Sequence, residues 1–494
     1  MKIYNTTFVL FTLLIFSNFN IQAQTLDEAV RYSFSDNIGS ARMLGSGGAF
    51  GALGGEIGAI LINPATAGSY QKGEFNISPM SLGSRTVGIF QGESTNDRNA
   101  NDLNFFNMGA VFSNTNRDRD KKWKATNFVI SLNKVSEFDQ RFTFAGVSEG
   151  TIAERFAERA NGLGLNELDD FEAGVAFDSE AIFDFEGDLT YSFDALPNQE
   201  LQRMQVARFE GGINELAFTL GGNYKNQLQL GVTLAFPILN FSSTKVYEEE
   251  YIDDVSAFRG LEYTENLSTT GNGLNIKAGA IFTGIKPLRI GVSVVSPTRF
   301  NLNDEFSTSM LYTFQIGDDQ FNGSASSPDG VFDYSYTTPW KFTGSLAYLL
   351  KTGTVNGFLS ADIDYLDYRT SGFDLTSDGN TEISLEQDLN NQINNELNSA
   401  INIRLGAEIA YDIYRVRLGY GINASPYEDD NSFFNSLSGG FGFRFEKFFF
   451  DLGLRRTFFS QGYTPYVSLN ENNVQAVVLD TRKTYIVSTF GIKF

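Results

Sequence analysis

Residues 401–411 have the sequence INIRLGAEIAY, in which every second side chain is apolar. The positions between them include Asn402, Arg404, Gly406 and Glu408. Because successive side chains of a β-strand point to opposite faces, this stretch predicts a strand with one apolar and one polar face. One face suits lipid and the other suits a wet lumen, which is the pattern of a transmembrane barrel strand.

A second strand follows after a tight turn. Residues 414–424 have the sequence YRVRLGYGINA, and the same alternation resumes. Two alternating segments with so short a connection predict a β-hairpin. Three further pairs show this pattern: 216–224 with 228–236, 341–350 with 355–365, and 437–445 with 448–454.

Extended over residues 74–494, the pattern gives about 14 strands, an even number, as bacterial barrels have. Very short connections near residues 226, 286, 352, 413 and 446 alternate with mostly long ones after residues 140, 251, 315, 371, 426 and 461. We therefore predict an all-β fold, a transmembrane antiparallel β-barrel whose short turns face the periplasm. The strands of a soluble β-sandwich also alternate, but they are commonly only about 5–6 residues long.

The composition fits this prediction and argues against other classes of protein. The chain has 47 Phe, 21 Tyr and 48 Gly but only 10 Pro, which favours strands joined by tight turns. It has no Cys and no His, so a nucleophile lacks its usual imidazole partner and zinc lacks its commonest ligand. We expect no enzyme, no metal and no cofactor. The net charge of −22 argues against a nucleic-acid partner.

The N-terminal residues have the features of an export signal. Lys2 precedes an apolar run over residues 8–16, and a short polar stretch ends near Ala23. We predict a signal peptide over residues 1–23, hence Sec export to the bacterial outer membrane. No later run of about 18 uninterrupted apolar residues is present, so strands must hold the chain in a membrane.

Between this signal and the first strand lies a glycine-rich segment that we predict to be a plug. Residues 40–55 have the sequence SARMLGSGGAFGALGG, and residues 60–65 have the sequence ILINPA. Glycine weakens a strand and Pro64 lacks a ladder donor, so the segment suits the inside of a lumen better than the wall. A phosphate-binding loop is the alternative, but the Lys-Ser/Thr end is missing. For residues 63–65 a simple turn is the alternative.

This glycine-rich stretch and its Asn-Pro-Ala element resemble the FadL-type transporters of hydrophobic compounds. SPTRF at 296–300, TPWKF at 338–342 and NIRLGAE at 402–408 resemble the Bacteroidetes branch of that family. The resemblance implies a fourteen-stranded barrel with a hatch over residues 24–73, and passive diffusion of fatty acids or aromatic compounds. It also implies a hatch movement and a kinked wall strand that lets ligand leave sideways. The ligand-path residues that it implies are Leu44, Phe50, Leu53, Leu61, Asn63, Pro64 and Ala65.

Three arginines on the predicted lumen face are candidates for binding a ligand carboxylate: Arg404, Arg417 and Arg455. The alternative is that they pair with inward acids. Those acids include Asp362, Asp364, Glu408 and Asp451.

Two segments outside the membrane are predicted to be helical. A large extracellular insertion near residues 140–212 contains a helix over 151–165, and a loop near 380–400 contains a helix over 384–400. Ser384 and Gln387 have the spacing of a capping box, and the second helix carries an apolar stripe. The stripe either packs on its own loop or forms an apolar landing site for ligand.

The expected partners are outer-membrane lipid, a small hydrophobic ligand and the barrel assembly machinery. The terminal alternation of Phe490, Ile492 and Phe494 resembles the signal that this machinery recognises. Two other functions remain open: a haemin-binding receptor, whose iron ligand would be Tyr or Met, and a barrel that scaffolds a protein partner in secretion.

Overall fold

The computed structural model describes residues 25–36, 39–98, 102–116, 118, 120–196, 198–375, 383–470, 473 and 475–494, so the predicted signal peptide lies outside the described residues. The helices are α1 (Leu26–Ser33), α2 (Ala41–Gly45), η1 (Gly58–Leu61), η2 (Pro64–Ser69), α3 (Ile152–Ala160), α4 (Ala173–Asp178), η3 (Tyr368–Thr370) and α5 (Ile383–Glu396). None of these is long and apolar enough to cross a bilayer.

Strands make up the rest of the regular structure. They are β1 (Glu74–Phe90), β2 (Glu93–Arg98), β3 (Asp102–Thr115), β4 (Trp123–Glu137), β5 (Gln140–Glu149), β6 (Glu200–Tyr224), β7 (Leu228–Tyr251), β8 (Phe258–Phe282), β9 (Leu288–Val295), β10 (Arg299–Ile316), β11 (Asp319–Ser326), β12 (Gly330–Thr337), β13 (Lys341–Thr352), β14 (Val355–Asp367), β15 (Gly372–Asp374), β16 (Ser399–Tyr411), β17 (Tyr414–Ala424), β18 (Phe433–Arg444), β19 (Phe448–Tyr463) and β20 (Val477–Lys493).

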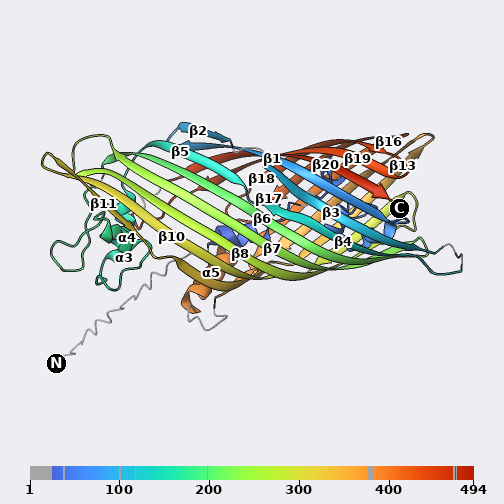
Figure 1. Cartoon of the computed structure of the whole chain (residues 1–494), viewed down its shortest axis with the longest axis horizontal. Coiled ribbons are helices and arrows are strands. Elements are labelled where there is room, and N and C mark those ends of the chain that lie inside the picture. The colour runs from blue at the N-terminus through green and yellow to red at the C-terminus, as the bar shows by residue number, and fades with distance from the viewer. Residues whose placement is uncertain are drawn as a thin grey trace, which may run out of the picture.

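These strands form one closed antiparallel sheet, because β1 pairs with β20 from Glu74–Lys493 to Ile89–Val478. Several wall strands are interrupted: β2 with β3, β4 with β5, β9 with β10, β11 to β13, and β14 with β15. Counting each of these as one strand gives a barrel of 14 strands, as predicted. All four hairpins predicted from the sequence are present. Figure 1 shows the tilted strands around the barrel.

The alternation along β16 sorts its side chains between the two faces of the wall. Ile403 and Leu405 are 38% and 47% exposed on the outside, whereas Arg404 and Glu408 are each 5% exposed on the inside. On β7 the exposed side chains are apolar from Leu230 to Ile238 and polar from Asn240 onward. An apolar band that ends partway along the strand is what a lipid bilayer requires.

The wall is much taller on one side than on the other. β6, β7 and β8 have 25, 24 and 25 residues, whereas β16 and β17 have 13 and 11. The long strands continue beyond the apolar band toward α3 and α4, at the end of the barrel opposite the C-terminus (Figure 1). The very short connections, including those at residues 353–354 and 412–413, lie at the C-terminal end.

The two proline motifs lie side by side where β9 gives way to β10 and β12 to β13. The Thr298 amide donates to Thr338 Oγ1 at 2.9 Å, and the Thr338 amide donates to the Thr298 carbonyl at 3.0 Å. These bonds replace the ladder that proline cannot complete. The connection after residue 315, grouped with the mostly long ones, is instead a tight turn at residues 317–318 that leads into β11, because Gly317 adopts a positive φ of 64°.

The predicted helices are present but differ in detail. Within residues 140–212, the flanks belong to β5 and β6, and residues 150–199 carry α3 and α4. α3 is shorter than predicted and has Thr151 as its N-cap. α5 begins at Ile383, so Ser384 is inside the helix rather than at the N-cap. Its buried stripe of Leu385, Leu389 and Ile393 joins a cluster with Ala29 and Tyr32 of α1.

Candidate functional site

The N-terminal segment (residues 26–70) lies against the inner face of the wall, and glycines of the wall make room for it. A Cβ atom at Gly231 would collide with the carbonyl group of Pro64, and one at Gly419 would collide with Gly47. Further inward glycines meet the segment in the same way: Gly221, Gly279, Gly291, Gly406, Gly440 and Gly453. The backbone of the segment therefore approaches the strands more closely than any side chain on them would allow.

Asn63 is the best-connected residue of the Asn-Pro-Ala element. Its Nδ2 donates to the Gly51 carbonyl at 2.7 Å, and its Oδ1 accepts from the Ala65 amide at 3.0 Å. Asn63 is thus the N-cap of η2, with Pro64 at the first helical position, where a missing amide proton costs nothing. Asn63 and Ala65 are completely buried.

A chain of ion pairs fastens the segment to the wall. Arg42 of α2 binds both carboxylate oxygens of Glu408 at 2.9 Å. Glu408 also accepts from Arg417 at 2.6 Å, and Arg417 lies 2.8 Å from Asp451. Arg444 closes the chain at 2.8 Å from the same aspartate. These five charges alternate in sign and are poorly exposed to water. Each charge offsets the cost of removing its neighbours from water, so the loss of one member leaves a buried charge without compensation.

The other two arginines predicted on the lumen face are paired as well. Arg404 binds Asp364 and lies 3.5 Å from Asp362, whose carboxylate accepts from the Gly51 amide at 3.0 Å. Arg455 donates to Asp36 at 2.9 Å. The structure thus places Arg404, Arg417 and Arg455 in pairs with acids of the chain, which is the second of the two interpretations of these residues.

The predicted ligand-path residues are buried, but they fall into different groups. Phe50 and Leu53 share a cluster with Met43 and Phe358. Leu44 packs in another cluster, against β1 and β20. Leu61 lines a cavity of about 80 Å³ whose wall also includes Phe34 and the two proline motifs. A separate hollow of about 710 Å³ with a polar lining opens at the C-terminal end, near Lys72 and Lys493.

Two larger apolar clusters fill the lumen, and the second of them includes α1 of the N-terminal segment. The outer cluster lies at the α3–α4 end and includes Phe90, Phe142, Phe144, Ile152, Phe156, Tyr247, Phe258, Tyr263 and Tyr312. The middle cluster includes Ala29, Tyr32, Phe138, Phe241, Phe300, Tyr336, Phe373, Leu385, Leu389 and Ile393. Phe209 packs against both. A continuous series of packed apolar side chains, which we call the apolar path, therefore extends from the α3–α4 end to α1.

The wall itself is interrupted beside this path. The ladder between β3 and β4 ends where Asn107 pairs with Asn133, although β4 continues to Glu137. After Phe138 and Asp139 the chain continues as β5, which pairs with β6. Phe138 points into the middle cluster, with its ring centroid 6.4 Å from Tyr32 and 5.8 Å from Phe241. The bend thus contacts α1 directly.

Sequence reasoning missed one basic residue of the site. The guanidinium carbon of Arg31, on α1, lies 4.2 Å from the ring centroid of Phe241 and 5.5 Å from that of Phe209. Among the described residues, no acid lies within ion-pair distance of Arg31. Its position in the helix α1 gave no sign of this, because the neighbouring phenylalanines come from β6 and β7. The inward glycines were visible in the sequence at the inward positions of the alternating strands, as at Gly406 and Gly419.

No protein-family model and no curated protein sequence matches the chain. Among solved structures, the fold is similar to that of a Pseudomonas aeruginosa FadL homologue, with a TM-score of 0.51 and 10% identity over 92% of this chain and 98% of that one. Toluene transporters of P. putida (TodX) and Ralstonia pickettii (TbuX) align over 93% of this chain and 99% of theirs, with TM-scores of 0.48 and 0.46 and identities of 11% and 12%. At these identities the likeness concerns the fold alone.

Proposed function

We propose that this protein lies in the bacterial outer membrane and lets small hydrophobic molecules pass inward by passive diffusion. The observation that carries the proposal is the apolar path from the outer cluster to α1, enclosed by a barrel with a lipid-facing band. Burying apolar ligand surface there contributes roughly 25 cal/mol per Å². No bound energy source is needed, because the ligand moves down its own gradient.

In this proposal the N-terminal segment acts as a hatch. It is held to the wall by close backbone contacts and by the ion pairs of Arg42, and α1 fills the inner end of the apolar path. A ligand that reaches the middle cluster competes with Tyr32 for contacts with Phe138 and Phe241. Displacing α1 opens two routes, one sideways at the β4–β5 bend and one past the segment along the barrel axis. The interrupted ladder favours the sideways route.

The substrate class is proposed to be decided by Arg31. The three lumen arginines chosen from the sequence are already paired with acids, so a ligand carboxylate meets no free cation there. Arg31 is half-buried beside the stacked rings of Phe209 and Phe241 at the junction of the clusters. A fatty-acid carboxylate placed there would gain an ion pair in a partly desolvated site, whereas an aromatic hydrocarbon would gain nothing from the charge.

Uptake measurements test the proposal. A strain lacking the protein is compared with strains that produce the natural chain or a variant lacking residues 44–65, using a labelled fatty acid and a labelled small aromatic hydrocarbon. We expect the deletion to slow uptake of at least one compound, and the truncated variant to differ from the natural chain. Unchanged uptake of both compounds in the deletion strain contradicts the transport function.

The Arg31→Gln variant distinguishes the two substrate classes. If the substrate is a fatty acid, its uptake falls roughly tenfold, as expected for loss of one charge-assisted contact of about 1.5 kcal/mol, and hydrocarbon uptake stays unchanged. Arg369→Gln is the matched control, because Arg369 is exposed and paired with Asp367 outside the lumen. Equal effects of the two variants would contradict a role for Arg31.

A further inference from the structure

A row of arginines crosses the outside of the barrel, although the chain as a whole carries a net charge of −22. Arg85 on β1 lies directly opposite Arg482 on β20 and also directly opposite Arg98 on β2. Arg141 on β5 lies directly opposite Arg208 on β6. All five side chains lie on the outward face of their strands.

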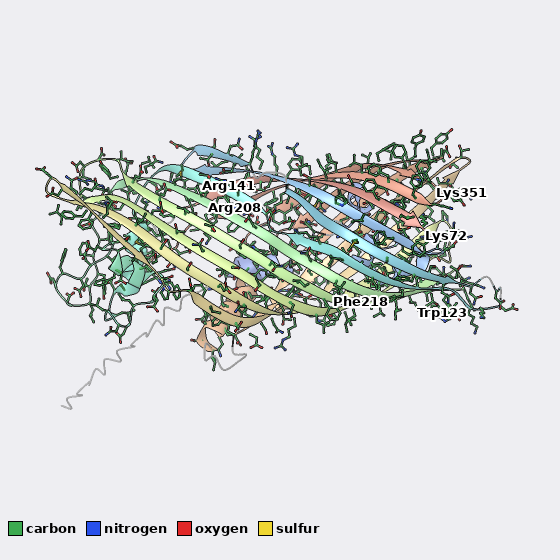
Figure 2. All side chains as sticks on the ribbon, viewed as in Figure 1. Lys72, Trp123, Arg141, Arg208, Phe218 and Lys351 are labelled. Carbon is green, nitrogen blue, oxygen red and sulfur yellow. The ribbon has the colours of Figure 1, made fainter. Side chains whose placement is uncertain are left out.

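The row is continuous from β19 to β6. On β19, exposed Arg456 lies two residues from Phe458, which is the register partner of Arg482. Arg141 meets β2 through Asp97, with nitrogen and oxygen 3.7 Å apart. Figure 2 shows Arg141 beside Arg208, far from Lys72 and Lys351 near the opposite end of the barrel.

On β19 and β20 the row begins where a charged residue first follows the run of exposed apolar residues, and exposed Phe458 and Val478 lie beyond it. Arg208 lies farther out, because its register partner Thr244 is six residues beyond Ile238, where the apolar band of β7 ends. On β20 the exposed residues Phe490 and Ile486 are followed by Thr484 and then by Arg482. On β19 exposed Leu452 and Leu454 are followed by Arg456. From Phe75 to Arg85 the strand advances roughly 33 Å, which at a tilt near 40° spans about 25 Å of membrane, the height of a barrel's apolar band.

Little on the protein balances these charges. Arg208 pairs with Glu210, and Arg141 is 3.7 Å from Asp97. Arg85 donates to the neutral Asn96 at 2.8 Å. Among the side chains that the structure describes, no acid lies within ion-pair distance of Arg85, Arg98, Arg456 or Arg482; Asp480 lies on the same face of β20 without pairing. By contrast, Arg299 and Arg369 on the opposite side each pair with an aspartate.

Like charges directly opposite one another destabilise a sheet. Three such pairs in one row are explained if an anion normally lies between them. From this arrangement we infer that the row binds the phosphate groups of a lipid in the adjoining leaflet, a lipid whose headgroup carries phosphate monoesters. Arginine binds phosphate through paired N–H donors, and Arg456, Arg482 and Arg85 directly follow the apolar run, at the depth of such headgroups. The inference needs only the membrane placement of the barrel, and it holds whatever the barrel transports.

Binding of a defined lipid to the purified full-length barrel tests the inference. The probe is lipid A with both phosphates, compared with dephosphorylated lipid A and with inorganic phosphate. We expect the phosphorylated lipid to bind and Arg85→Gln/Arg482→Gln to weaken its binding at least roughly tenfold. Lys72→Gln/Lys351→Gln, which removes the same charge at the other end, should leave binding unchanged.

A stability measurement keeps the test decisive if one variant folds poorly. In zwitterionic micelles without phosphate, Arg85→Gln/Arg482→Gln should unfold at the same or a higher temperature, because repulsion is removed. Phosphorylated lipid A should raise the unfolding temperature of the natural chain more than that of this variant. The Arg141→Gln/Arg208→Gln variant removes a pair on two other strands, β5 and β6, and should give the same result. Equal binding by dephosphorylated lipid A, equal stabilisation by inorganic phosphate, or equal loss in the lysine variant would each overturn the inference.

Discussion

At the scale of single residues, the inward glycines determine how closely the N-terminal segment approaches the wall. Gly419 is the clearest case, because an added Cβ would overlap the backbone of Gly47. Gly344 on β13 offers the contrast, since it faces outward and an added Cβ meets nothing within 4 Å. The same chemical change at the two positions therefore separates crowding of the segment from the effect of glycine on a strand.

We predict that Gly419→Ala destabilises the seated segment by about 1–3 kcal/mol, the usual cost of overpacking, and that Gly344→Ala changes stability by less than about 1 kcal/mol. The chain has no cysteine, so Ser46→Cys provides a single label at a completely buried position. Maleimide should react faster with this cysteine in the Gly419→Ala background than in the Gly344→Ala background. Equal rates would show that the glycine does not seat the segment.

Asn63 is the second residue whose replacement should have a large effect. Asn63→Ala removes the cap of η2 and leaves the buried Gly51 carbonyl without its 2.7 Å partner. We expect a loss of about 2–4 kcal/mol in the free energy of unfolding, measured in urea with the barrel in lipid vesicles. Asn394→Ala, at an exposed position of α5, should stay within about 0.5 kcal/mol. A loss as small as that of Asn394→Ala would count against the capping role.

At the scale of elements, α1 carries a buried acid that makes its packing depend on pH. Burial and, to a lesser extent, nearby Asp304 raise the pKa of Glu28 to about 8, against the opposing effects of Arg31 and Lys245. In the unfolded chain the carboxyl has its ordinary value of 4.5. The folded state therefore holds a proton that the unfolded state loses between these pKa values, so this contribution to stability falls as pH rises from 4.5 to 8.

We predict that Glu28→Gln removes this dependence and still accepts the 3.1 Å hydrogen bond from the Thr25 amide. The difference in urea midpoint between variant and natural chain should be small below pH 4.5, grow in favour of the variant as pH rises, and level off above about 8. Taking the difference cancels the other titrating groups. A difference that does not change with pH would mean that Glu28 is ionised in the folded protein.

At the scale of the whole molecule, the C-terminal strand both closes the barrel and ends in an exposed aromatic. Phe494 is 68% exposed, and its amide donates to the Gly73 carbonyl at 3.0 Å. Phe490 and Ile492 are exposed on the same face of β20. The side chain of Phe494 is exposed and contributes little to packing in the lumen.

We predict that Phe494→Ala lowers the amount of assembled barrel in the outer membrane several-fold while the assembled fraction keeps its unfolding temperature. Phe445→Ala is the control, because Phe445 is an exposed aromatic at the same end but lies in a turn. Heat-modifiable migration on gels measures the assembled fraction. If both variants assemble like the natural chain, the terminal strand is not the recognised element.

The alternation of residues 401–424 determined the strands, the hairpins and the face that each side chain takes, because the period of two is a local property of the chain. The same pattern, repeated to the C-terminus, was enough to predict a barrel of about 14 strands. The glycine-rich stretch before β1 likewise indicated a segment unsuited to lipid, since glycine and proline act on their own backbone.

Only the tertiary structure decided which distant residues meet. Four contacts depend on register between strands: the partner of Arg417, the packing of α5 on α1, the place of Arg31 beside Phe209 and Phe241, and the opposition of Arg85 to Arg482. Register across the closure of the barrel joins β1 to β20, and nothing in either strand alone specifies it, because a shift by two residues preserves the alternation of both faces.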